Sequence, residues 1–338
     1  MRAVVFEAPG QLSVQEVPDP TPGPADVVVE VAGVGICGTD VHVHDGHYAG
    51  TQFPLIPGHE VSGTVVAVGA DVTAVSVGDR VVVDPTLSCG ECDQCVNGAY
   101  NLCVNWNSFG VTRTHGASAE YLLAPARNAY RLPEGVDLFQ ATMIEPLSCA
   151  IRAHDVLPRR LGDHHLVYGA GTMGLLIAQL APRAGAASVA VVDPNEGRRA
   201  LAREVGIETV VASADELDRS LWDVVVDATG VVAAMEDGLP RVKAGGTFQH
   251  FGVAPADATA RYSPNRIVRD EVTIVGSAAS RHSFSRAVEL FAAGAVVSEP
   301  MFSHAFTLDD YAQAMAMFRR GEGRKLQIRP GASSSGEV

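Results

Sequence analysis

The stretch HHLVYGAGTMGLLIAQLA, residues 164–181, decides the fold. It predicts a buried strand, a glycine turn and an apolar helix, in that order. Three glycines at the turn spell G-x-G-x-x-G. Between a strand and a helix this pattern is the dinucleotide-binding fingerprint, because glycine permits the tight turn, the approach of a pyrophosphate and close helix packing. The residues expected to contact the phosphates are Gly169, Gly171, Thr172, Met173 and Gly174.

Further buried strands and helices alternate on the carboxyl side of this turn. SVAVVDP (188–194), DVVVDATG (223–230) and VTIVGSAA (272–279) read as strands, and GRRALAREVG (197–206) reads as a helix. Alternation of this kind predicts an α/β fold with a doubly wound parallel sheet. We therefore expect residues 146–279 to form a dinucleotide-binding domain.

Asp193 ends the second strand of this domain. A carboxylate there can accept hydrogen bonds from both ribose hydroxyls of NAD and would repel a 2′-phosphate, so NAD is expected rather than NADP. Arg198 lies close by in the sequence and is a further cofactor-binding candidate, although its charge weakens the preference. Gly252 and Ser277 follow later strands and are expected near the nicotinamide.

Residues 1–145 are predicted to be β-rich. Short valine-rich runs such as DVVVEVAGVG (26–35) and DRVVVDP (79–85) are separated by Gly, Pro and Asp, which indicates a partly open barrel of antiparallel strands. Residues 280–330 are expected to return to this domain. The small polar residues of 331–338 indicate a disordered tail.

Composition excludes several classes of partner. The chain has 338 residues and a net charge of −14, so nucleic acid and anionic membranes are unfavourable partners. The first ten residues contain no apolar signal segment, and no apolar run reaches the length of a bilayer span. A cytoplasmic location is expected.

Four of the six cysteines lie in SCGECDQCVNGAYNLC, residues 88–103. They could form two disulfides, a redox pair or a metal clip. Reducing conditions disfavour the first, and a C-x-x-C redox pair leaves two thiols without a role. Four thiolates suit zinc in a closed, structural site, so a zinc lobe is expected at residues 88–104. The expected ligands are Cys89, Cys92, Cys95 and Cys103.

Other candidate ligands lie in GICGTDVHVHDGH (35–47), PGHE (57–60) and IEPLSCA (144–150). Taken one at a time, none of these residues indicates a metal site. The ordered set C-G-T-D-x-H, G-H-E, four cysteines, E-P and G-x-G-x-x-G, however, resembles the zinc-dependent medium-chain dehydrogenases, and within them the polyol branch. The resemblance covers the chain to about residue 330 and implies a GroES-like catalytic domain beside the Rossmann domain.

The resemblance assigns roles to individual residues. Cys37 and His59 match ligands of a catalytic zinc, and Glu60 and Glu145 match the two carboxylates that complete or alternate in its coordination. Thr39 matches the hydroxyl that takes the substrate proton, and His42 the residue that relays it to solvent. Asp40 matches the acceptor that orients His59. Two zinc ions per chain and a homo-tetramer or homo-dimer are implied.

The implied activity is the NAD-linked oxidation of a secondary hydroxyl of a sugar alcohol to a ketone. An amino-polyol or cyclitol dehydrogenase carries the same motifs and is the main alternative. Threonine dehydrogenase fits less well, because the loop HVHDGHYAGTQFP (42–54) does not resemble that family's longer version. A non-catalytic NAD-binding relative and a zinc-ribbon interaction module are alternatives from other classes.

Overall fold

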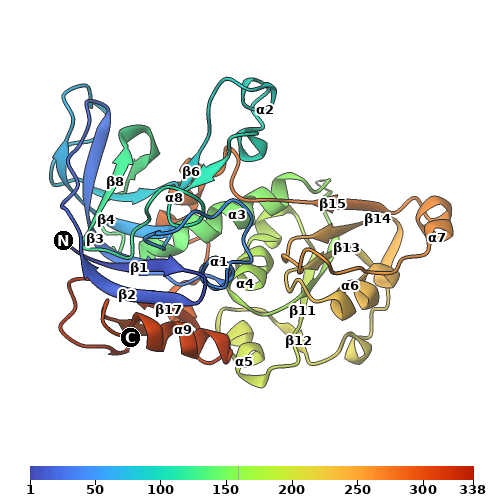
Figure 1. Cartoon of the computed structure of the whole chain (residues 1–338). Helices are drawn as coiled ribbons and strands as arrows, with labels where there is room; N and C mark the ends of the chain where they lie inside the picture. The colour runs from blue at the N-terminus through green and yellow to red at the C-terminus, as the bar shows by residue number, and fades with distance from the viewer. Residues whose placement is uncertain (159) are drawn as a thin grey trace. The chain divides into compact units, whose positions relative to one another are not determined.

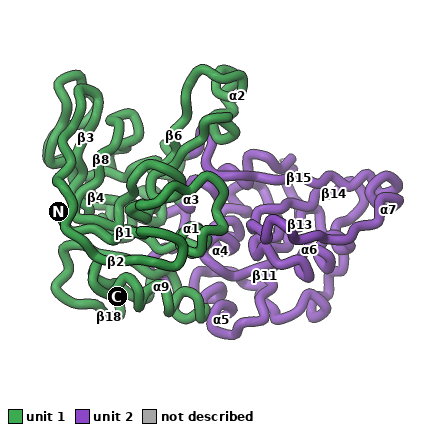
Figure 2. Tube along the Cα trace, viewed as in Figure 1, with its two compact units in different colours: residues 1–145, 284–293, 302–338 green, residues 146–283, 294–301 purple. Residues whose placement is uncertain are grey.

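The computed structural model describes residues 1–158 and 160–338, which divide into two compact units (Figure 2). Unit 1 comprises residues 1–145, 284–293 and 302–338. Unit 2 comprises residues 146–283 and 294–301. The chain therefore leaves unit 1 once for a long excursion and crosses between the units twice more near its end.

Unit 2 is built on a parallel sheet, which confirms the predicted doubly wound α/β fold. Within the described residues its strand order is β12-β11-β10-β13-β14-β15, and every pairing is parallel (Figure 1). The central strand β13 is buried at each of its six positions, as expected for a sheet covered on both faces. The strands are β10 (His164–Tyr168), β11 (Ser188–Val192), β12 (Thr209–Val211), β13 (Trp222–Asp227), β14 (Val242–His250) and β15 (Thr273–Gly276).

The helices of unit 2 alternate with these strands. They are α4 (Thr172–Leu180), α5 (Glu196–Glu204), α6 (Val232–Gly238) and α7 (Pro264–Arg269), and α3 (Ile144–Asp155) leads in from unit 1. Helix α4 ends before Pro182, which cannot continue it, and Gly206 follows α5 with a φ of 93°. The crossover from β10 through α4 to β11 and the return to β13 place a topological switch point at the carboxyl end of β10.

Unit 1 is β-rich. Its main sheet has the order β18-β16-β17-β3-β4-β5-β9, with β8 also paired to β3, and most pairings are antiparallel. The strands are β3 (Asp26–Gly35), β4 (Glu60–Val68), β5 (Arg80–Val83), β8 (Tyr121–Pro125), β9 (Ala129–Arg131), β16 (Phe302–Phe306), β17 (Lys325–Ile328) and β18 (Gly336–Glu337). Smaller ladders join β1 (Arg2–Ala8) to β2 (Gln11–Glu16) and β6 (Thr86–Leu87) to β7 (Asn107–Ser108).

The core of unit 1 explains why the chain returns to it. Valines of β3, β4 and β5 share one buried cluster with Phe306, Tyr311, Leu326 and Ile328 from the carboxyl-terminal segment. Unit 1 also contains helices α1 (Gly38–His44), α2 (Asp93–Val96), α8 (Phe284–Ala292) and α9 (Tyr311–Arg319). Strand β17 pairs with β3, so the last part of the chain completes the sheet that carries the first candidate ligands.

Two features of the domain organisation differ from expectation. Unit 1 resumes at Phe284, whose ring packs on Tyr130, rather than at residue 280. Residues 294–301 belong to unit 2, because the backbone N–H of Val297 donates to Gln179 on α4 at 2.6 Å. Sequence patterns did not show these interleaved boundaries because each depends on a contact between residues far apart in the chain.

The tail, residues 331–338, is not disordered in the structure, contrary to expectation. Strand β18 pairs with β16 through Ala305 and Gly336. Ser335 donates to a carboxylate oxygen of Asp310 at 2.6 Å. Small polar residues have little apolar surface to bury, but their backbone groups can form hydrogen bonds with the free edge of strand β16. The amino-acid composition of the tail does not reveal this pairing. No helix in the described ranges is long and apolar enough to span a bilayer.

Candidate active site and cofactor site

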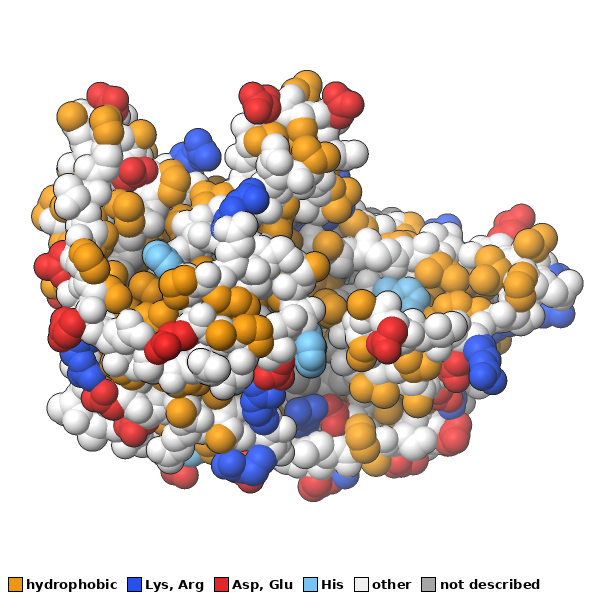
Figure 3. Space-filling view, in the orientation of Figure 1, with side chains coloured by type: hydrophobic (Ala, Val, Ile, Leu, Met, Phe, Trp, Pro, Cys, Tyr) orange, Lys and Arg blue, Asp and Glu red, His pale blue; other side chains and the backbone are white. Residues whose placement is uncertain are grey.

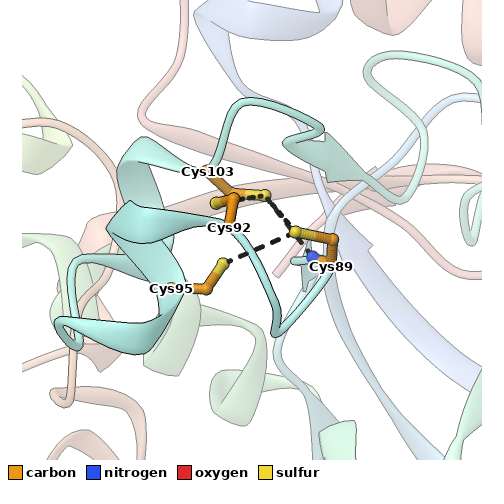
Figure 4. A group of neighbouring side chains, drawn as sticks. All are labelled: Cys89, Cys92, Cys95 and Cys103. Atoms are coloured by element: carbon orange, nitrogen blue, oxygen red, sulfur yellow. Dashed lines mark hydrogen bonds between the residues drawn. The ribbon is translucent and has the colours of Figure 1, made fainter.

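The four cysteines of the lobe converge on one point (Figure 4). The sulfur of Cys89 lies 3.9 Å from that of Cys95 and 3.4 Å from that of Cys103, and the sulfurs of Cys92 and Cys103 are 3.9 Å apart. Thiolates placed 2.3 Å from one tetrahedral zinc ion lie about 3.8 Å from each other. None of the four is in a disulfide. The sulfurs therefore fit a closed zinc site.

The lobe has little else to hold it together. Val96, Leu102 and Val104 expose 72%, 55% and 75% of their surface instead of packing inwards, and the lobe projects from unit 1 in the space-filling view (Figure 3). Backbone N–H groups of Cys95 and Val104 lower the pKa of Cys92 to about 6, whereas burial and the neighbouring thiols raise the pKa of Cys95 to about 11. The four thiols cannot all ionise without a cation, so a bound metal would supply the missing cohesion.

A second cluster lies where β3 runs into α1. Ligand atoms of Cys37, His59 and Glu60 all lie within 4.8 Å of one another. Cys37 caps the amino end of α1, and its backbone N–H donates to Asp40 at 2.8 Å, which fixes the turn out of β3. His59 and Glu60 enter at the start of β4, which pairs with β3. One thiolate, one imidazole and one carboxylate form a donor set that suits a catalytic zinc, because it leaves a coordination position open.

Asp40, which the resemblance assigns to orienting His59, lies beside the imidazole of that residue. Its carboxylate is 3.6 Å from Nδ1 of His59, which leaves Nε2 as the ring nitrogen available to a metal. Both side chains are buried. Burial lowers the pKa of His59, but the charges of Asp40 and Cys37 outweigh it, so the pKa lies well above its ordinary value.

The remaining catalytic candidates lie around this cluster. Thr39 lies on the first turn of α1 with its hydroxyl 3.7 Å from the sulfur of Cys37. His42, one helical turn further on, is exposed to solvent. Glu145 is not in the group of mutually close ligand atoms, but burial and the charge of Glu60 raise its pKa to about 7 while His59 opposes this. The structure thus brings Glu60 into the cluster directly and places Glu145 within its electrostatic reach.

Lys325 is a member of this site that the sequence did not indicate. Its ammonium forms an ion pair with Glu60 and donates to the carbonyl oxygen of Ile36 at 3.0 Å. Burial lowers the pKa of Lys325, but Glu60 and Cys37 outweigh that effect and raise it. No local motif could have revealed this residue, because it lies more than 260 positions from Glu60 and reaches it only through the pairing of β17 with β3.

The glycine turn of unit 2 has the geometry of a phosphate cradle. Gly169 has a φ of 100°, and a Cβ on Gly174 would overlap the carbonyl of Gly169. Nothing lies within 4 Å of a Cβ built on Gly171, which caps the amino end of α4. Thr172 and Met173 form the first turn of that helix. A pyrophosphate can therefore approach open backbone at the positive end of a helix dipole.

The other cofactor candidates lie at the carboxyl edge of the same sheet. Asp193 is buried and accepts hydrogen bonds from the N–H groups of Ala170 and Asn195, both at 2.8 Å. Arg198 lies 3.8 Å from its carboxylate and is half exposed. Gly252 donates to the carbonyl of Asp227, and Ser277 follows β15. These residues surround the strand ends next to the glycine turn, so the residues present fit a dinucleotide.

Comparison with known proteins identifies the family. Residues 23–134 match the alcohol dehydrogenase GroES-like domain, and residues 172–293 match the zinc-binding dehydrogenase domain. D-arabinitol dehydrogenase 1 of Uromyces fabae is 35% identical over 98% of this chain and 97% of its own length. The chain belongs to the zinc-dependent medium-chain dehydrogenases, in their polyol branch.

Two further members of this family are similar over most of their length. D-altritol 5-dehydrogenase of Agrobacterium fabrum is 34% identical over 92% of this chain and 94% of its own. A zinc-binding dehydrogenase of Sinorhizobium meliloti, whose crystal structure holds NADP, superposes with a TM-score of 0.91 at 33% identity and covers 97% of this chain and 99% of its own.

Membership of the zinc-dependent medium-chain dehydrogenases confirms the predicted fold and reaction class. The chain is an NAD(P)-linked oxidoreductase that acts on CH–OH groups, and its β-rich unit is the GroES-like domain. A zinc-ribbon interaction module does not account for a match that extends through both units.

Proposed function

We propose that this dehydrogenase oxidises a secondary hydroxyl of a sugar alcohol to a ketone and transfers the hydride to NAD. The observation that carries the proposal is the donor set of Cys37, His59 and Glu60, in which a carboxylate accompanies a single thiolate. An oxygen-rich metal site suits a substrate that offers several hydroxyls. The arabinitol and altritol dehydrogenases to which the chain is similar act on substrates of this class, as their names state.

We propose two zinc ions per chain with separate roles. Cys89, Cys92, Cys95 and Cys103 would hold a structural ion, and Cys37 and His59 would hold a catalytic one, with Glu60 and Glu145 as the carboxylates that complete its coordination. A zinc ion at the second site would supply Lewis acidity that lowers the pKa of a coordinated hydroxyl. Asp40 would keep the imidazole of His59 oriented with Nε2 towards the ion.

The chain's own residues would move the substrate proton. The hydroxyl of Thr39 lies beside the sulfur of Cys37, so it can accept the proton of a substrate hydroxyl bound at the cluster. His42 follows one helical turn later and is exposed, so it can release a proton to solvent.

We propose NAD rather than NADP as the cofactor. The buried carboxylate of Asp193 adjoins the glycine turn, where it can accept from ribose hydroxyls and would repel a 2′-phosphate. The half-exposed Arg198 offsets part of this charge. Because the Sinorhizobium meliloti relative was solved with NADP, both cofactors need to be tested on this chain.

The test is reduction of the cofactor, followed by absorbance, against sugar alcohols, cyclitols, amino-polyols, threonine and simple alcohols, with NAD and NADP in parallel. A strong reaction with a sugar alcohol and NAD supports the proposal, and a stronger one with a cyclitol or amino-polyol favours the main alternative. If a preparation with two zinc ions per chain reduces neither cofactor with any of these compounds, the proposed substrate class is wrong.

We also propose a homo-tetramer or homo-dimer that works in the cytoplasm. The four sulfurs in the lobe, 3.4–3.9 Å apart and without a disulfide, are suited to a reducing compartment. Light scattering coupled to gel filtration measures the mass in solution, and a monomer at micromolar concentration would contradict the assembly.

A further inference from the structure

The ion pair between Glu60 and Lys325 lies inside the candidate catalytic cluster and is almost completely buried. Glu60 is 1% exposed and Lys325 is 5% exposed. The ammonium also donates to the carbonyl of Ile36, the residue before Cys37, at 3.0 Å. One contact of this lysine is therefore with Glu60, a candidate metal ligand. The other is with the residue that precedes Cys37, a second candidate ligand.

Gly35 makes the pairing possible. It is the last residue of β3, which lies between β4 and β17, and it pairs with Glu60 on one side and Gln327 on the other. A Cβ on Gly35 would overlap the carboxylate of Glu60 and lie 2.8 Å from Cε of Lys325. The two side chains meet in the space that the missing side chain leaves.

The chain's use of basic residues sets this lysine apart. The sequence contains 23 arginines and only two lysines, Lys243 and Lys325, and Lys243 is half exposed in an ion pair with Asp223. A planar guanidinium is broad and rigid, whereas an ammonium is a compact point charge on a slim stem. The narrow space above Gly35 favours the second.

Because Glu60 is both a potential metal ligand and the partner of Lys325, two cations compete for one buried carboxylate. We propose, building on the zinc site of the proposed function, that Lys325 is a positioning residue that competes with the catalytic metal for Glu60. Without metal, the ammonium neutralises the cluster and holds it together. When the metal is bound, the ammonium of Lys325 still attracts the carboxylate of Glu60. Glu60 therefore remains an exchangeable ligand, and the ion binds more weakly.

The test is a double-mutant cycle on metal affinity. Cobalt(II) is the probe, since its visible bands report the number and kind of ligands, and its affinity for the second site is measured by competition with a chelator in wild type, K325M, E60Q and K325M/E60Q. K325M should bind cobalt at least tenfold more tightly than wild type and with an altered spectrum, because Glu60 becomes free to coordinate. In the E60Q background, the same change should alter the affinity less than twofold.

Thermal unfolding of the metal-free proteins gives an independent measurement. K325M should melt several degrees below wild type, because it leaves a buried carboxylate unpaired, and K325M/E60Q should recover most of the loss. K243M is the matched control for cobalt affinity, which it should leave unchanged, because it removes the chain's other lysine from unit 2; its own melting temperature should fall, since it leaves the buried carboxylate of Asp223 unpaired. K325Q, which keeps a donor for the carbonyl of Ile36, replaces K325M if that variant does not fold.

Three results would overturn the inference. Weaker cobalt binding by K325M would mean that Lys325 helps the metal rather than competing with it. An equal gain in affinity with and without Glu60 would mean that the ammonium acts by repulsion alone. A wild-type chain that binds metal only at the cysteine lobe would remove the competition. None of these three measurements depends on substrate turnover. A failure to oxidise any sugar alcohol would therefore contradict the proposed function without affecting this inference.

Discussion

Replacing Gly35 by alanine should destabilise unit 1 severely, although the backbone tolerates the change. Gly35 lies in a regular strand, and its φ is outside the left-handed region, so alanine meets no conformational penalty there. The new methyl group would instead collide with the carboxylate of Glu60 and with Cε of Lys325. Breaking a buried ion pair costs about 3–5 kcal/mol, so we expect a loss of this size in the free energy of unfolding.

Gly33 offers a matched control two residues earlier in the same strand. A Cβ there would lie 3.5 Å from Gln327 and Thr142, which is ordinary contact, so G33A should fall within about 1 kcal/mol of wild type.

The chain has one tryptophan in each unit, Trp106 in unit 1 and Trp222 in unit 2. Urea unfolding at saturating zinc in a W222F background therefore follows unit 1 through Trp106. If G35A unfolds at the same urea concentration as G33A, the ion pair over Gly35 is not the constraint that the structure indicates.

Cys37→Ser should abolish turnover and leave NAD binding, measured by fluorescence titration, unchanged, whereas the control C149S should keep most of its activity. Cys95→Ser should lower the melting temperature, and it should reduce the zinc content by one ion per chain. A stable but inactive protein would mean that the structural and catalytic metal roles are assigned to the wrong clusters. Asp193→Asn should raise the ratio of kcat/KM for NADP over NAD at least tenfold, and an unchanged ratio would exclude Asp193 as the discriminating residue. Hydrogen bonding to Arg319 lowers the pKa of Asp45 to about 2, below its value in the unfolded chain. This pair should therefore stabilise the folded protein by on the order of 1 kcal/mol above about pH 4, and this stabilisation should disappear as the pH falls towards 2. The difference in urea midpoint between wild type and R319M, measured with chelator present, should therefore shrink as the pH falls through this range.

Local patterns were sufficient to predict the parallel sheet and the glycine turn of unit 2, but not its boundaries. The glycine fingerprint requires a strand before it and a helix after it, and β10 and α4 lie at those positions. The alternation of valine-rich runs with helical segments indicated a parallel sheet, and Gly206 marked the end of α5. In this unit all the strand pairings except that of β10 with β13 join strands that are consecutive in the chain, so short-range pattern and tertiary structure largely agree.

The two candidate metal-binding clusters were predictable to different degrees. The four cysteines lie within fifteen positions, so their spacing alone indicates a shared site. Cys37, His59 and Glu60 were linked only through the order of motifs, because pairing of β3 with β4 brings them together. Lys325 and the ordered tail escaped prediction for the same reason: both depend on strands that pair with residues far away in the sequence.

The position of Lys325 gives the return of the chain to unit 1 a chemical role as well as a structural one. Leu326 and Ile328 enter the core of unit 1, and the backbone N–H of Ile36 donates to the carbonyl of Leu326 at 2.9 Å, so β17 is fixed in register against the residue that precedes Cys37. That register decides which side chain of β17 lies over Gly35. A shift by one residue would place Lys325 on the opposite face of the sheet and leave Glu60 buried without a counter-charge. The hydrophobic residues of β17 thus set the electrostatics of a candidate metal site whose three mutually close ligand groups, Cys37, His59 and Glu60, lie in the first 60 residues.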